Sequence, residues 1–90
     1  MSELTQTRAY SMMGQKEIYG IVRRGMRDTE YYYTNLAEAV RKYDELCHRK
    51  NYYAIELFRF PVNGKYFREY VYTTQKNIVN APYRNVSMRK

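Results

Sequence analysis

The sequence predicts an α+β protein with a mainly antiparallel sheet of about four strands, in ββαββ order, and one helix packed on one face. Three observations predict this fold. Runs rich in β-branched and aromatic residues flank a single helical stretch, an Asn-Gly pair separates two of these runs, and 90 residues suffice for one domain. We divide the chain into an N-terminal arm (1–15), a core domain (16–73) and a basic C-terminal tail (74–90).

The core domain is predicted to begin with a hairpin. Residues 17–23 (EIYGIVR) form its first strand, in which Gly20 marks a bulge or a close contact. Residues 24–28 (RGMRD) form the turn, with Gly25 free to adopt a positive φ. Residues 30–33 return as the second strand. The arm before this hairpin is polar and shows no pattern.

Residues 36–50 are predicted to form the helix. Asn35 can cap its start, with Glu38 at the capping-box spacing and Thr34 as a rival cap. Asn51 is expected to end it in the left-handed conformation. The apolar stripe expected to face the sheet contains Leu36, Val40, Tyr43 and Cys47.

Residues 52–60 and 65–73 are predicted to form a second hairpin around Asn63-Gly64. A two-residue turn would pair Phe60 with Phe67, and the same parity holds for a four-residue loop. The following residues would then share one face, on which the helix packs: Ile55, Leu57, Tyr70 and Tyr72, with Ile55 opposite Tyr72.

The opposite face is predicted to carry Phe58, Phe60, Phe67 and Val71, which need a cover. Either the arm or tail of this chain folds over them, or another molecule does, such as the second copy in a homodimer. We expect at least two of the rings to be buried. These four residues are also the candidate protein interface.

Cysteine use and hydropathy favour the cytoplasm. Cys47 is the only cysteine, so no intramolecular disulfide can form, as is usual in a reducing compartment. No apolar run approaches the roughly 18 residues needed to cross a bilayer, and the first 15 residues lack the hydrophobic stretch of a signal peptide. We expect no membrane partner.

The inventory of catalytic residue types is short. The single His and the single Cys are adjacent, and adjacent helical residues point about 100° apart, so Cys47 and His48 cannot act as a nucleophile–base pair. Metal-ligand spacings and glycine-rich nucleotide motifs are missing. We therefore expect no enzymatic activity, no cofactor and no metal. A metal-independent RNase that uses Arg, Lys and Tyr stays an alternative.

Charge and tyrosine content point to a polyanion. The net charge is +7, and 12 residues are tyrosine. Basic residues attract phosphates and aromatic rings stack on unpaired bases, although tyrosine is also an ordinary strand former. The sequence patterns of the RRM, KH and helix-turn-helix folds are missing, which favours backbone or single-strand binding, with RNA preferred. The candidate nucleic-acid-binding residues are Lys16, Arg23, Arg24, Arg27, Arg59, Lys65, Arg68, Tyr31 and Tyr32.

Residues 31–60 (YYYTNLAEAVRKYDELCHRKNYYAIELFRF) resemble, in their organisation, small accessory proteins of tailed bacteriophages. The resemblance implies a non-enzymatic protein of the host cytoplasm that binds a host protein or nucleic acid and inhibits a defence or toxin system. It transfers no site residue. The preferred function is thus a basic nucleic-acid-binding accessory protein. The alternatives are a protein–protein inhibitor or dimeric adaptor that uses the aromatic sheet face, and the RNase.

Overall fold

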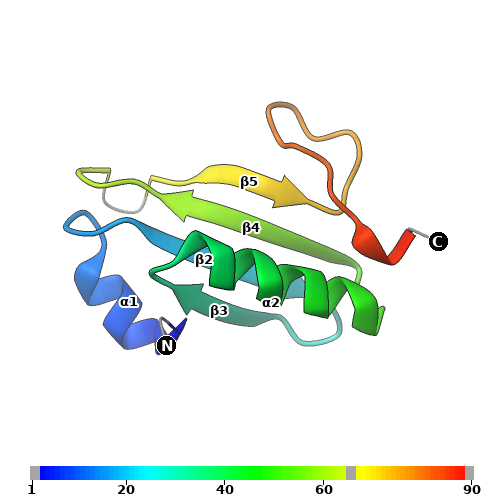
Figure 1. Ribbon diagram of the computed structural model, residues 1–90, viewed down its shortest axis with the longest axis horizontal. Helices are drawn as coiled ribbons and strands as arrows, with labels where there is room; N and C mark the ends of the chain where they lie inside the picture. The colour runs from blue at the N-terminus through cyan, green and yellow to red at the C-terminus, as the bar shows by residue number, and fades with distance from the viewer. Residues whose placement is uncertain (1–2, 65–66, 89–90) are drawn as a thin grey trace.

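The computed structural model describes residues 3–64 and 67–88, which form one antiparallel sheet with an α-helix on each face (Figure 1). The strand order is β1-β3-β2-β4-β5. The strands are β1 (Glu3–Leu4), β2 (Ile18–Arg24), β3 (Thr29–Tyr33), β4 (Ala54–Phe60) and β5 (Glu69–Thr73). The helices are α1 (Gln6–Met12), α2 (Leu36–Arg49) and a 3-10 turn, η1 (Val86–Met88). The α+β class and the ββαββ core are confirmed, whereas β1 and α1 were not predicted.

The start of α2 is the one that the sequence predicts. The backbone N–H of Glu38 donates to the side-chain oxygen of Asn35 at 3.0 Å, which satisfies one of the unpaired donors of the first turn. The end differs by one residue. Lys50, not Asn51, adopts the left-handed conformation, with φ 61°, and its N–H bonds to the carbonyl of Cys47.

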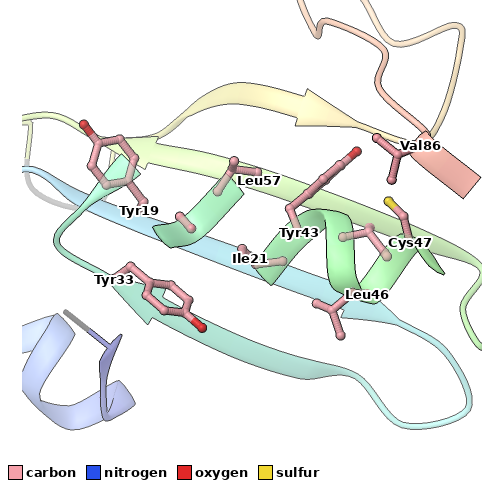
Figure 2. Close-up of a cluster of buried hydrophobic side chains, with 10 residues drawn as sticks. Tyr19, Ile21, Tyr33, Tyr43, Leu46, Cys47, Leu57 and Val86 are labelled. Atoms are coloured by element: carbon pink, nitrogen blue, oxygen red, sulfur yellow. The ribbon is translucent and has the colours of Figure 1, made fainter. Parts of the chain in front are cut away.

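The helix α2 packs on the sheet face that the sequence assigns to it, over Ile55 and Leu57 of β4. Figure 2 shows Tyr43 and Cys47 of the helix beside Val86 of η1, with Leu46 on the other side of the helix; all four belong to the same buried cluster. Helix, sheet and C-terminal turn therefore share one core.

The predicted stripe of α2 is wrong in its orientation. The buried residues are Ala39, Tyr43, Leu46 and Cys47, whereas Leu36 at the first turn is 43% exposed and Val40 is only half-buried. Both stripes contain Tyr43 and Cys47. The predicted stripe adds Leu36 and Val40, whereas the buried one adds Ala39 and Leu46. The row that contains small Ala39 lets the helix approach the sheet closely.

The predicted register of the second hairpin is also wrong. A bulge between Leu57 and Phe58 shifts the pairing, so that Leu57 lies opposite Tyr72 and Phe58 opposite Tyr70. Tyr70 therefore lies on the opposite face from Leu57. The backbone of Ile55 bonds with Thr74, not with Tyr72.

The register differs because the connection is longer than a tight Asn-Gly turn. The N–H of Gly64 bonds to the carbonyl of Pro61 at 3.1 Å, and Asn63 adopts a positive φ of 67°. β5 starts only at Glu69. Lys65, which the sequence placed at the start of this strand, lies outside the described residues.

The N-terminal arm is ordered secondary structure, contrary to the expectation of an unpatterned segment. Thr5 caps α1 by accepting from the N–H of Arg8. Ala9 and Met13 then pack on the second sheet face against Phe58 and Phe60, both of which are buried. The expected burial of at least two rings, under this chain's own arm, is confirmed.

The other two residues of the candidate protein interface lie elsewhere. Phe67 is 58% exposed in the hairpin connection, and Val71 packs, half-buried, against the α2 side of the sheet. The four residues predicted to share one face therefore do not do so, because Phe58 pairs with Tyr70, which puts Tyr70 and not Val71 on the face of Phe58.

Of the two predictions for glycines in the first hairpin, one is confirmed and one is wrong. Gly20 makes the predicted close contact, since a Cβ there would lie 2.9 Å from Cε1 of Tyr32. Gly25 does not adopt the predicted positive φ.

The C-terminal residues 82–88, which we call the C-terminal strap, lie along β5 and α2. The N–H of Thr73 donates to the carbonyl of Pro82, and the N–H of Arg84 donates to that of Thr73, both at 2.9 Å. The Arg84 guanidinium pairs with Asp44 at 2.6 Å, and the hydroxyl of Tyr43 donates to the carbonyl of Arg84. None of the helices described is both long and apolar enough to span a bilayer.

Candidate nucleic-acid interface

Arg24, one of the predicted phosphate-binding residues, is paired with two carboxylates, although its side chain is 43% exposed. Its guanidinium donates to Glu56 at 3.0 Å and to Asp28 at 3.2 Å. Glu56 is only 5% exposed and also accepts from the hydroxyl of Tyr70. A buried carboxylate needs such a partner, so Arg24 serves the fold of the sheet first.

Arg59 is paired in the same way at the opposite end of the sheet. It bonds to Glu17 at 2.7 Å and to Glu69 at 2.5 Å. The hydroxyl of Tyr19 also donates to Glu17, and the hydrogen bonds from Tyr19 and Arg59 lower the pKa of that carboxyl. The positive charge of Arg59 is therefore balanced by two acidic neighbours.

The remaining predicted residues are spread over the molecule. Lys16 is exposed just before β2, and the Arg68 guanidinium lies over the ring of Phe58 at 4.0 Å. Tyr31 faces α2, with the ammonium of Lys42 at 4.7 Å from its ring.

Tyr32 is buried on the α1 side, and burial raises the pKa of its hydroxyl. The eight predicted residues that the structure describes therefore do not form one surface, because successive strand residues point to opposite faces, and Lys65 lies outside the described residues.

Arg23 and Arg27, by contrast, come together at the β2–β3 turn. They line an open groove of about 410 Å³ between this turn and the segment that follows α2. We call it the turn groove; its lining residues are Arg23, Gly25, Met26, Arg27, Asn51, Tyr52 and Tyr53. A hydrogen bond of 2.7 Å from the N–H of Tyr53 to the carbonyl of Arg24 ties its two sides together.

Arg23 is fixed in the groove entirely by neutral acceptors. Its guanidinium donates to the carbonyl of Asn51 at 2.6 Å, to the carbonyl of Arg27 at 3.0 Å and to the hydroxyl of Thr29 at 3.1 Å. None of these groups carries a negative charge. The side chain is thus pre-organised while its positive charge remains uncompensated.

One further cation lines the groove with Arg23, and another directly precedes a lining residue in the chain. Arg27 is exposed on the turn, and Lys50 directly precedes Asn51; neither makes an ion pair within the described residues. Next to them, Tyr53 is 77% exposed and Met26 is 99% exposed. The turn groove therefore combines two unpaired cations, Arg23 and Arg27, with an open aromatic ring and a flexible apolar side chain, and Lys50 precedes its lining residue Asn51 in the chain.

Sequence reasoning missed Lys50, Asn51 and Met26 as members of this site. The signal for Lys50 and Asn51 was the end of the helix, which turns the chain back toward the first hairpin. Met26 carried no signal beyond its place in the turn. Among residues 3–64 and 67–88, no group of three His, Cys, Asp or Glu side chains is placed to hold a metal ion.

Comparison with known proteins gives no further guide to the site. No protein-family model matches the chain, and neither a curated protein nor a solved structure matches it significantly. The function is therefore argued from the geometry of the turn groove.

Proposed function

We propose that this protein binds single-stranded nucleic acid without cleaving it, and that the turn groove is the binding site. The observation that carries the proposal is the pair of unpaired cations, Arg23 and Arg27, that line the groove with the exposed ring of Tyr53, next to the exposed Lys50 that precedes Asn51 in the chain. Cations attract the phosphate backbone through counterion release, and an exposed ring stacks on a base that has no partner. RNA is the preferred form because its unpaired loops present such bases.

The same proposal extends to the biological setting. We place the binding in the cytoplasm, that of a host cell if the chain is encoded by a phage, and we regard inhibition of a host defence system as the role that the phage resemblance implies. Cleavage of RNA remains the alternative activity. Labelled RNA that stays intact after incubation in EDTA would support binding without cleavage, whereas fragments would support the RNase.

The test of the groove is the salt dependence of binding to a 12-nucleotide single-stranded RNA. In the double variant Arg27→Ala/Lys50→Ala the fold should persist, because both side chains are exposed and only the backbone of Arg27 is used by Arg23. Each lost phosphate contact flattens the slope of log K against log salt by about 0.7 for a single strand. The double variant should therefore bind more weakly, with a slope smaller by about 1.4.

The matched control is Arg41→Ala/Lys76→Ala, which removes one Arg and one Lys that are exposed but do not line the groove. It should keep the wild-type slope. Tyr53→Ala should weaken binding by about 1–3 kcal/mol at every salt concentration, and Tyr53→Phe should not. Equal slopes in the two double variants would exclude the turn groove as the binding site.

A further inference from the structure

A second hollow, of about 230 Å³, lies on the α1 face of the sheet and has no part in the turn groove. We call it the sheet pocket. Four of its nine lining residues are aromatic, one is acidic and one is basic. The lining residues are Tyr10, Met13, Gly20, Val22, Glu30, Tyr32, Phe58, Phe60 and Arg68.

The pocket exists because β2 carries a glycine at its centre. Gly20 lies opposite Tyr32 of β3 and Phe58 of β4, and it has no side chain to fill the space between their rings. A Cβ at this position would lie 2.9 Å from the ring of Tyr32 and 3.1 Å from that of Phe60. The rings of Tyr32 and Phe60 therefore pack directly against Gly20, which lets them form adjoining walls of the pocket.

The acidic residue of the pocket is held in place by its neighbours. Glu30 accepts from the hydroxyl of Tyr32 at 2.8 Å and from the side-chain amide of Gln6 at 3.0 Å. Both bonds end on the same oxygen, Oε1. The second oxygen, Oε2, takes part in neither, so it can accept a hydrogen bond from a ligand.

The basic residue lies on an aromatic wall. The guanidinium of Arg68 stands 4.0 Å from the centre of the Phe58 ring, and Arg68 makes no ion pair within the described residues. An exposed cation at this place can bind an anionic group that stays outside the aromatic walls.

These features define the chemistry of a ligand. Pockets for drug-sized molecules measure about 300–1,000 Å³, so the sheet pocket suits a single ring system. Flat aromatic walls favour a planar ring, Oε2 of Glu30 requires a hydrogen-bond donor on it, and Arg68 favours an attached anion. A nucleobase with an exocyclic amino group, linked to a phosphate, meets all three conditions.

We propose that the sheet pocket receives one unpaired base carrying an amino group, from the strand that binds in the turn groove. This inference rests on the proposed function. The two sites meet on β2, where Val22 lines the pocket and the next residue, Arg23, lines the groove. Because consecutive residues of a strand face opposite sides, a nucleic acid that rounds the β2–β3 turn would reach both.

The ligand preference follows from Glu30. Cytosine and adenine each present an amino group as a donor, whereas uracil presents carbonyl oxygens there, which a carboxylate repels. Wild-type protein should bind 12-nucleotide oligomers of cytidine or adenosine about 5- to 10-fold more tightly than one of uridine. In Glu30→Gln this preference should vanish or reverse, because the new amide can donate to a uracil carbonyl. The matched control, Glu45→Gln, makes the same change of charge on α2 and should keep the preference.

A second measurement locates the base independently of any variant. Titration with 5′-CMP, followed by amide NMR, should shift the signals of Gly20 and Phe58, which line the sheet pocket and lie outside the turn groove. Equal affinity of all three oligomers with an intact salt slope, or unmoved Gly20 and Phe58 signals, would overturn the base pocket and leave the turn groove standing. A protein that binds none of the oligomers at low salt would overturn both proposals.

Discussion

The orientation of α2 can be tested with two leucines of the same helix. Leu46 is 1% exposed and belongs to the core beneath the helix, whereas Leu36 is 43% exposed at the first turn. The sequence pattern assigns the opposite importance to them, since Leu36 is in the predicted stripe and Leu46 is not. Substituting each by Ala therefore distinguishes the two orientations.

The expected effects differ severalfold. Truncating a fully buried Leu to Ala costs about 2–5 kcal/mol, because the lost burial adds to the cost of a cavity, and we expect about 3 kcal/mol for Leu46→Ala. Leu36 opens onto solvent, so no closed cavity forms and the loss should stay at or below about 1 kcal/mol. Alanine is the best helix former, so helix propensity adds no cost at either site.

Urea denaturation followed by circular dichroism at 222 nm measures both variants. For a domain of this size, about 3 kcal/mol corresponds to a melting temperature lower by roughly 12–24 °C, out of a total stability of about 5–13 kcal/mol. The slope of the free energy of unfolding against urea should match the wild type in both. If Leu36→Ala costs as much as Leu46→Ala, the helix is rotated toward the sequence-predicted stripe and the described packing is wrong.

Two further predictions concern the sheet and its alkaline limit. Gly20→Ala should lower the free energy of unfolding by about 1–3 kcal/mol, because the rings of Tyr32 and Phe60 that the new methyl would strike are themselves buried; a melting temperature equal to the wild type would contradict the close contact. Burial raises the pKa of the Cys47 thiol from 9.0 to about 11 and that of Tyr33 from 10.0 to about 12. Above about pH 9 the unfolded chain therefore binds fewer protons than the folded one, so stability should be flat near pH 8 and fall between pH 9 and 12, less steeply in Cys47→Ala; constant stability to pH 11 would refute this.

Local signals predicted the elements well because their causes are local. The Asn35 cap acts within one turn of its helix, and the alternation of Ile55 and Leu57 assigns the face of β4 without reference to any other strand. Gly20 indicated a close contact because a glycine inside a strand usually marks a bulge or a place where another group approaches the backbone. These features depend on chain geometry over a few residues.

The features that sequence reasoning missed depend on contacts between distant residues. The pairs Arg24–Glu56 and Arg59–Glu17 join positions 32 and 42 residues apart, so the sequence alone could not show that two of the predicted phosphate-binding cations are already neutralised. The bulge at Leu57 and Phe58 depends on how the hairpin connection packs. Alanine is only weakly hydrophobic, so Ala39 gave no clear signal that its side of α2 faces the sheet.

The two ends of the chain also govern how this protein meets copies of itself. An open outer strand presents unpaired N–H and C=O groups on which a second chain can build, and this is a common route to aggregation. Here the short edge strand β1 pairs with Tyr32 and Tyr33 of β3, while the C-terminal strap pairs with Thr73 of the other edge strand, β5. A chain shortened to residues 18–73 would keep the four main strands but lose both β1 and the C-terminal strap. It would therefore be prone to polymerise edge to edge. Solubility in this fold is therefore a property of its termini as much as of its charge.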